Sequence, residues 1–268
     1  QINLLEKDFT IEKKWTFVLL LRQKRKSSKN PKHFIEILDK YKDYCKDSQS
    51  SNEYLQNLQG IRTYASTGNL SWGVKFIRNH GIESLFKALH EIKSNSDNQL
   101  TAIKSQQFTQ ILESLYYFAD MKSGNAYLRS TYEKQPKDSN FLRTLISYLT
   151  PTEEENNAIL IQLIFALNES PTFAEDCIQY LSETFFNNKK NGFEIISEII
   201  SFRKQKEIEE SKNKTHPTTS QYVSKKKESL FPKYLIENMC YLIKALCLKS
   251  RSNLVNYFNL IIILHDTL

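Results

Sequence analysis

The sequence predicts an all-α protein built from repeated helical units, and three observations support this prediction. Apolar residues recur at three- and four-residue spacing along almost all of the 268 residues, without the alternation typical of β-strands. Only 6 glycines and 6 prolines are present, fewer than turn-rich β architectures use. A short, a medium and a long apolar segment also follow one another twice, which indicates internal repetition.

Composition indicates an intracellular globular protein. Hydrophobic residues make up 40% of the chain and charged residues 25%, enough for a packed core, and none of the apolar runs is long enough to cross a bilayer. The net charge of +7 is compatible with an acidic protein, anionic lipid or nucleic acid as partner. The cysteines lack the spacing of zinc ligands, so we expect reduced thiols: Cys45, Cys177, Cys240 and Cys247.

Three helices are expected in the first part of the chain. The first covers about Thr10–Arg22 and is followed by a lysine-rich tract, Arg22–Lys29. The second covers about Pro31–Lys42, because proline is favoured in a first helical turn. The third covers about Ser51–Ala65 and ends at the polar break Ser66-Thr67-Gly68-Asn69.

The pattern from Leu70 onward predicts an armadillo-like α-solenoid. Glycine is expected to supply a left-handed cap at His80-Gly81, after the first of three helices. Two sets of three helices are expected, at Leu70–Asn79, Ile82–Lys93 and Thr101–Met121, and again at Asn125–Thr131, Asn140–Leu149 and Glu153–Asn168. The two sets are offset by about 50 residues, close to the period of armadillo arrays, whose helices bury their faces against neighbouring repeats.

A third copy is visible at Leu242–Leu246, after a polar segment at about residues 204–229. The composition of that segment indicates either a flexible insertion or an extension of a helix that frays. We therefore expect a small helical subdomain over residues 1–68 and an armadillo-repeat domain over residues 69–268. Because Gln1 is not an initiator and the chain stops after the apolar run Leu260–Leu264, we expect a C-terminally truncated piece of a longer protein.

Catalytic chemistry is not predicted. The chain has no phosphate-binding glycine motif, no metalloprotease motif and no nucleophile elbow, and its five histidines lie at unrelated positions. Glu153-Glu154-Glu155 opens a helix, where the helix dipole favours carboxylates. We expect no catalytic residue, no metal, no cofactor and no enzyme activity.

Nucleic acid and membrane partners are also not expected. Most aromatic residues fit the helical core pattern, and no pair of base-reading residues recurs once per repeat. Lys225-Lys226-Lys227 fits a solvated charge run better than a lipid site, so membrane contact would be indirect or weak.

Two stretches carry a resemblance to a known family. Asn69–Leu89 contains a Ser71-Trp72 pair, Phe76 four residues later, and Gly81 before a leucine-rich helix. Leu5–Trp15 places the basic pair Lys13-Lys14 before a large apolar residue. In these features the chain resembles the N-terminal GTPase-binding and armadillo-repeat (diaphanous inhibitory) region of diaphanous-related formins, along nearly its whole length.

The resemblance implies a regulatory role in the cytoplasm, at the actin cytoskeleton. In that family the helical N-terminal piece and the first repeat bind the GTP form of a Rho-family GTPase. The concave face of the repeats binds the formin's own C-terminal autoregulatory helix, and GTPase binding releases that helix and the actin-nucleating domains. Actin would be reached only through domains outside this chain.

Two sets of residues are candidates for these contacts. The GTPase-binding candidates come from the N-terminal helix and the polar break: Phe9, Lys13, Lys14, Phe17, Val18, Leu21, Ser66, Thr67, Gly68 and Asn69. The candidates for the autoregulatory-helix groove come from the third helix of each repeat: Glu113, Tyr116, Tyr117, Asp120, Gln162 and Phe165.

Two alternatives stay open at the level of sequence. Trp15–Leu21 is apolar on nearly all sides, which suits either a partner-binding face or burial between two neighbouring helices. Tyr116 and Tyr117 suit either a groove or the core. The other functional hypothesis is an armadillo-type scaffold that binds another peptide or protein cargo without a GTPase.

Overall fold

The computed structural model describes residues 30–44, 46–94, 101–134, 141–168, 170–183 and 190–214. Helices hold 87% of these residues, and no β-strand is found among them, which confirms the all-α prediction. The described part contains eleven helices: α2 Pro31–Asp39, α3 Tyr41–Tyr44, α4 Ser48–Ser66, α5 Leu70–Arg78, α6 Gly81–Ser94, α7 Thr101–Asp120, α8 Lys122–Lys134, α9 Phe141–Ser147, α10 Glu154–Leu167, α11 Pro171–Ser182 and α12 Gly192–Lys214. The helix predicted at Thr10–Arg22 and the third copy at Leu242–Leu246 lie outside the described residues.

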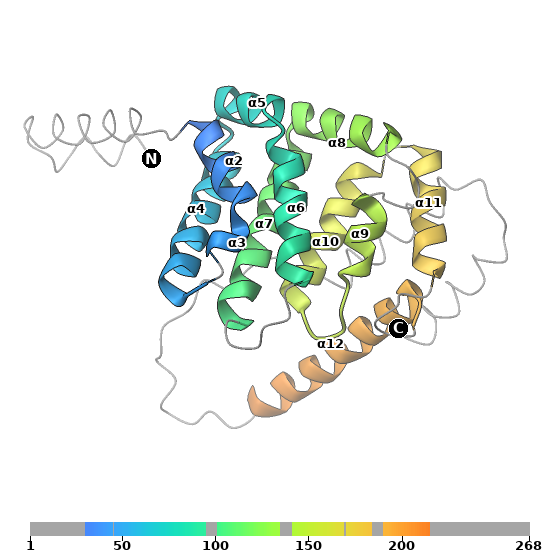
Figure 1. The fold of residues 1–268 in the computed structure, drawn as a ribbon. Coiled ribbons are helices and arrows are strands. Elements are labelled where there is room, and N and C mark those ends of the chain that lie inside the picture. The colour runs from blue at the N-terminus through green and yellow to red at the C-terminus, as the bar shows by residue number, and fades with distance from the viewer. Residues whose placement is uncertain are drawn as a thin grey trace, which may run out of the picture.

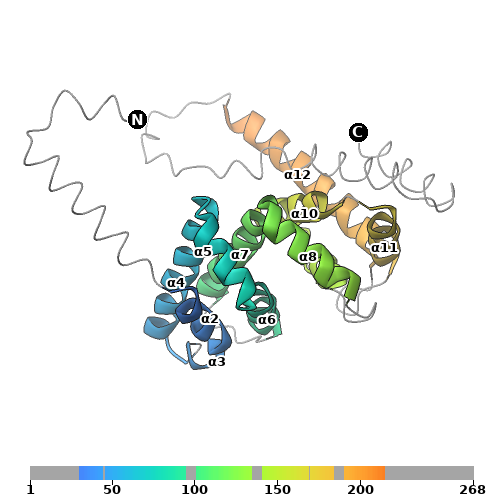
Figure 2. The same cartoon turned by 90° about the horizontal axis from the view of Figure 1, so that it is seen from above.

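Three helices pack side by side and organise the rest of the fold. α7 lies between α4 and α10 and also contacts α6 and α8. The helices α5 and α8 lie across one end of this row (Figure 1). The last described helix, α12, begins beside α11 and extends away from the other helices at its far end (Figure 2).

Buried apolar residues form one continuous core, from Phe34 in α2 to Ile200 in α12. An aromatic stack holds α4, α5 and α7 together within it. The Trp72 ring stacks between Tyr64 and Phe76, at centroid distances of 4.8 and 5.0 Å. Phe76 in turn stacks on Phe118 at 5.1 Å. Stacked aromatic pairs add to the stability that area burial provides, so this stack fixes α5 on both longer helices.

Polar side chains define where several helices begin. Asn30 accepts a hydrogen bond from the Lys32 N–H at 3.2 Å and starts α2, with Pro31 in the first turn as predicted. Asp47 accepts from the Ser50 N–H at 2.7 Å and starts α4. Both side chains satisfy backbone donors that a helix leaves without an intrahelical acceptor.

The turn between α5 and α6 corrects one prediction. The left-handed residue is His80, with φ 64°, and not Gly81, which is the first residue of α6. The structure shows why glycine is needed at position 81. A Cβ atom there would lie 2.4 Å from the Phe76 ring, so the backbone approaches the aromatic stack closely. Gly81 is therefore required by packing and not by its φ angle.

Two further boundaries differ from the sequence prediction. The helix expected over Pro31–Lys42 is divided at Lys40, whose N–H bonds to the Ile37 carbonyl and ends α2 before α3. The polar segment predicted from residue 204 is helical at least to Lys214, as the end of α12. Of the two interpretations left open, the described part of this segment supports the helix extension.

The α7–α8 turn brings two backbones into close contact. Gly124 lies so near α7 that an added Cβ would be 2.0 Å from the Phe118 carbonyl oxygen. Next to it, the Asn125 side chain donates to the carbonyls of Ala119 and Ala166, both at 3.0 Å. This one amide therefore joins α7, α8 and α10.

Within the described ranges, no helix combines the length and the apolar character needed to cross a bilayer.

We predict that Gly124→Ala lowers the free energy of unfolding by about 1–3 kcal/mol, because the new methyl group meets backbone that cannot rotate away. Urea denaturation measures the change. Gly68→Asn is the control: Gly68 has φ 64° and open space around it, and asparagine tolerates that conformation, so its stability should change far less. Equal effects of the two substitutions would contradict the close backbone contact.

Candidate partner-binding surface

The first candidate region is the break between α4 and α5. The helix α4 ends at Ser66, Thr67 follows as its C-cap, and Gly68 turns the chain in the left-handed conformation. The Asn69 side chain then accepts from the Trp72 N–H at 3.2 Å and starts α5. All four residues are exposed, so the structure brings these predicted GTPase contacts together at one end of the row of helices.

The side chains of the break are partly used by the fold itself. The Ser66 hydroxyl donates to the Thr63 carbonyl and the Thr67 hydroxyl to the Tyr64 carbonyl, both at 3.2 Å. What the break offers a partner is therefore exposed backbone and one apolar group. Leu70, directly after Asn69, is 66% exposed, the highest value among the large apolar residues described. The sequence prediction did not single out Leu70.

The other predicted GTPase contacts lie outside the described residues. They are Phe9, Lys13, Lys14, Phe17, Val18 and Leu21.

The second candidate region is the solvent-facing side of α4, α7 and α10, which we call the long-helix face. Among the six predicted groove residues, Asp120 is exposed and Phe165 is 48% exposed. Tyr116, Tyr117 and Gln162 are half-buried. The centroids of the two tyrosine rings lie 5.6 Å apart, and both rings pack against the core. Each tyrosine is therefore partly a core residue and partly a surface residue.

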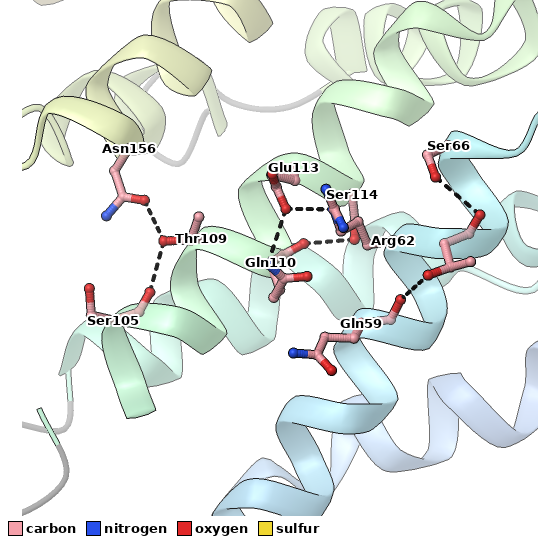
Figure 3. Close-up of polar contacts among 10 residues, drawn as sticks. Gln59, Arg62, Ser66, Ser105, Thr109, Gln110, Glu113, Ser114 and Asn156 are labelled. Carbon is pink, nitrogen blue, oxygen red and sulfur yellow. Dashed lines mark hydrogen bonds and ion pairs between the residues drawn. The ribbon is translucent and has the colours of Figure 1, made fainter. Parts of the chain in front are cut away.

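Glu113 is the exception, because its side chain is buried. Its carboxylate forms an ion pair with Arg62 of α4, with 2.7 Å between Oε2 and Nε. Gln110 also donates to the same carboxylate at 3.1 Å. Figure 3 shows this group between α4 and α7. Glu113 therefore holds two helices together and is not an exposed groove contact.

The electrostatics of this group follow from burial. Desolvation raises the pKa of Glu113 above its ordinary value, and the nearby Glu155 carboxylate raises it further. Arg62 and Gln110 act in the opposite direction without cancelling the effect of burial. Burial also raises the pKa of the Tyr116 hydroxyl, helped by the negative charge of Asp120.

A second polar contact joins α7 to α10. The Thr109 hydroxyl contacts the Asn156 side-chain oxygen at 2.8 Å and the Ser105 carbonyl at 3.0 Å (Figure 3). Side chains that are distant in sequence thus join both neighbouring pairs of helices in the long-helix face, α4 with α7 and α7 with α10. Sequence reasoning missed Arg62, Thr109 and Asn156, since no local pattern pairs them.

The described residues include no group of three or more His, Cys, Asp or Glu side chains that could hold a metal ion. The buried thiol of Cys177 has a pKa raised by desolvation and by Asp176, so it is a poor nucleophile. The exposed groups are amides, hydroxyls, carboxylates and a few apolar side chains.

No family model matches this chain, and neither a curated protein nor a solved structure matches it.

We predict that Arg62→Ala destabilises the protein by about 1–3 kcal/mol at neutral pH, because it leaves the Glu113 carboxylate buried without its cation. Glu113→Gln should cost less, since the amide oxygen still accepts from Gln110 and the exposed part of Arg62 stays hydrated. Urea denaturation of both variants measures the difference. A larger cost for Glu113→Gln would contradict this account.

The pH dependence provides a separate test. Because the folded protein holds the Glu113 proton more tightly than the unfolded chain, the stability linked to this group is fully present below its unfolded pKa. It is lost as pH rises through the raised pKa of the folded state. The unfolding free energy of the natural chain, relative to Glu113→Gln, should therefore fall as pH rises from about 4. A rise over the same range would contradict the dominance of burial.

Proposed function

We propose that this chain is a protein-binding module of the armadillo type, and not an enzyme. The observation that carries the proposal is the side-by-side packing of α4, α7 and α10, with equivalent helices returning in chain order. α5 and α8 both lie across the same end of the row, and each is followed by one helix and then by a member of the row (Figure 1). Such a repeat gives an extended face on one set of helices, which suits a polypeptide partner.

We further propose that one partner is a Rho-family GTPase in its GTP form. Supporting this, the break at residues 66–69 is exposed, and Leu70 adds an apolar centre beside it. The basic pair Lys13-Lys14 would supply charge complementary to acidic groups of a GTPase. In this role the chain is the regulatory region of a diaphanous-related formin, acting in the cytoplasm at the actin cytoskeleton.

That proposal includes an autoregulatory partner. The formin's own C-terminal helix would bind the long-helix face, and GTPase binding would release it, which controls actin filament nucleation by domains outside this chain. Phe165 and the half-buried Tyr117 are the apolar groups that such a helix would cover.

A second candidate function is an armadillo scaffold for another peptide or protein, without a GTPase. The observation that favours it is the polarity of the long-helix face. Five exposed or half-buried glutamines lie on α4 and α7, whereas an amphipathic helix binds best to a mainly apolar groove.

The GTPase proposal is tested by affinity for Rho-family proteins loaded with a GTP analogue or with GDP. We expect binding of the GTP-analogue form only, and about tenfold weaker binding by Leu70→Ser, since a central apolar contact contributes more than 1 kcal/mol. Ile208→Ser is the matched control, because Ile208 is 53% exposed but lies on α12, far along the chain from the break. Leu70→Ser should leave thermal stability nearly unchanged, because the side chain is largely exposed.

Equal affinity for the two nucleotide states, or none for any Rho-family member, would overturn the GTPase proposal. Binding of a diaphanous autoregulatory peptide separates the two candidates, because a scaffold for unrelated cargo would not bind it.

A further inference from the structure

Positive charge is concentrated on α5 and α8, the two helices that lie across one end of the row. Among the described residues, 20 lysines and arginines stand against 21 aspartates and glutamates. α5 and α8 hold five of these basic residues and one acidic residue, which gives a net charge of +4. The rest of the described residues therefore carry a net charge of −5. This end of the molecule differs in sign from the remainder of its described part.

The basic side chains lie on the sides of α5 and α8 that are turned away from the core. Lys75 and Arg78 are one turn apart on α5, and Lys122 and Arg129 are two turns apart on α8. Lys75, Arg78 and Lys122 are exposed, and Arg129 is half-buried. We call Lys75, Arg78, Lys122 and Arg129 the cationic end.

Most of this charge is not neutralised within the fold. Glu133 lies one turn after Arg129 on α8 and offsets it, and Asp120 is the last residue of α7, just before α8. The other three cations form no salt bridge with another described residue: Lys75, Arg78 and Lys122. Charge complementarity therefore favours an anionic partner at this end.

The arrangement of the two helices favours a planar partner. α5 and α8 contact each other and lie at the same level across the end of the row (Figure 1), and Figure 2 looks down on this end. With 9 and 13 residues, the helices are about 13 and 20 Å long. The cations are thus distributed along two helix flanks. A bilayer offers anionic headgroups over the whole of such an area, whereas a bound peptide requires pockets for its side chains.

The uncharged side chains favour a membrane over nucleic acid. Trp72 and Phe76 of α5 are buried, and both tyrosines of α8 donate hydrogen bonds to carboxylates of other helices. The aromatic rings of these two helices are therefore not available for stacking on bases. Leu70, at the start of α5, is 66% exposed. An exposed leucine beside lysine and arginine suits the boundary between headgroups and acyl chains of an anionic leaflet.

We propose that the cationic end binds the surface of an anionic lipid bilayer. Lys75, Arg78 and Lys122 attract the headgroups, and Leu70 enters the boundary between headgroups and acyl chains. Contact through a few cations and one leucine is weak and reversible. This role goes beyond the proposed binding of proteins and does not depend on the GTPase.

The probe is a set of phosphatidylcholine vesicles that contain phosphatidylserine, and binding of the full chain is measured by cosedimentation. The bound fraction should rise with the phosphatidylserine content and fall as salt is added. Vesicles of phosphatidylcholine alone are the uncharged control. Duplex DNA and polyglutamate, added as competitors, test the two other classes of anionic partner and should compete only weakly.

Paired variants test the surface. Lys75→Gln with Lys122→Gln should weaken vesicle binding about tenfold, because each cation near an anionic bilayer adds to the attraction. The control, Lys40→Gln with Lys42→Gln, removes the same charge from exposed positions at α2 and α3 and should have little effect. Leu70→Trp should tighten binding several-fold, because tryptophan favours the membrane interface.

Four results would overturn the proposal. They are no binding to phosphatidylserine vesicles, equal binding to uncharged vesicles, tighter binding of DNA or polyglutamate than of vesicles, and equal effects of the two lysine pairs. Replacement of Lys225, Lys226 and Lys227 by serine tests the lysine run near the end of the chain. Vesicle binding that this replacement abolishes would assign the contact to that run and overturn the proposal, whereas retained binding supports it. Vesicle binding is measured without a GTPase and GTPase affinity without lipid, so the two proposals fail separately.

Discussion

The burial of α7 between α4 and α10 is the constraint on which the rest of the structure depends. A helix with neighbours on two sides needs apolar side chains around most of its circumference, and α7 supplies Ile111, Leu112, Leu115 and Phe118, all fully buried. Only a narrow strip of α7 then reaches solvent. Because α4 and α10 are held by the same helix, their own solvent-facing strips line up beside it. Packing of the core therefore creates the long-helix face as a consequence.

Polar contacts fix the register of this packing where apolar contacts would allow sliding. The Arg62–Glu113 pair joins α4 to α7, and the Thr109–Asn156 contact joins α7 to α10. Both lie at the edge between core and solvent, where a misplaced partner would leave a buried polar group unsatisfied. At the end of the row, the stack of Trp72, Phe76 and Phe118 holds α5 in place by apolar contact. Polar contacts thus fix the alignment of the helices that form the long-helix face, and burial of apolar area fixes the helix that crosses their end.

Most helices of the described part could be predicted from apolar spacing, because local periodicity is encoded within each segment. The sequence placed α4, α5, α6 and α7 to within a few residues. The prediction of a left-handed Gly81 was wrong, because His80 takes that conformation. Glycine is needed at position 81 because the Phe76 ring leaves no space for a side chain there. The sequence also failed to indicate Arg62 as the partner of Glu113, since helices brought together by folding leave no local pattern. Of the GTPase candidates, the structure describes only the break at residues 66–69, and the contacts predicted in the N-terminal helix stay predictions.

The two candidate regions share one helix, and this determines how they influence each other. The break at residues 66–69 is the end of α4, whereas Gln56 and Gln59 lie along its side. Coupling between two ligands requires that each favour a different arrangement of a shared element. In this structure the core and the ion pair with α7 hold α4 in one position, and no second arrangement that could relay binding is on view. Under the proposed function, competition between partners at these two regions is therefore expected to be direct, by overlap near Ser66, and partners that avoid this residue should bind independently.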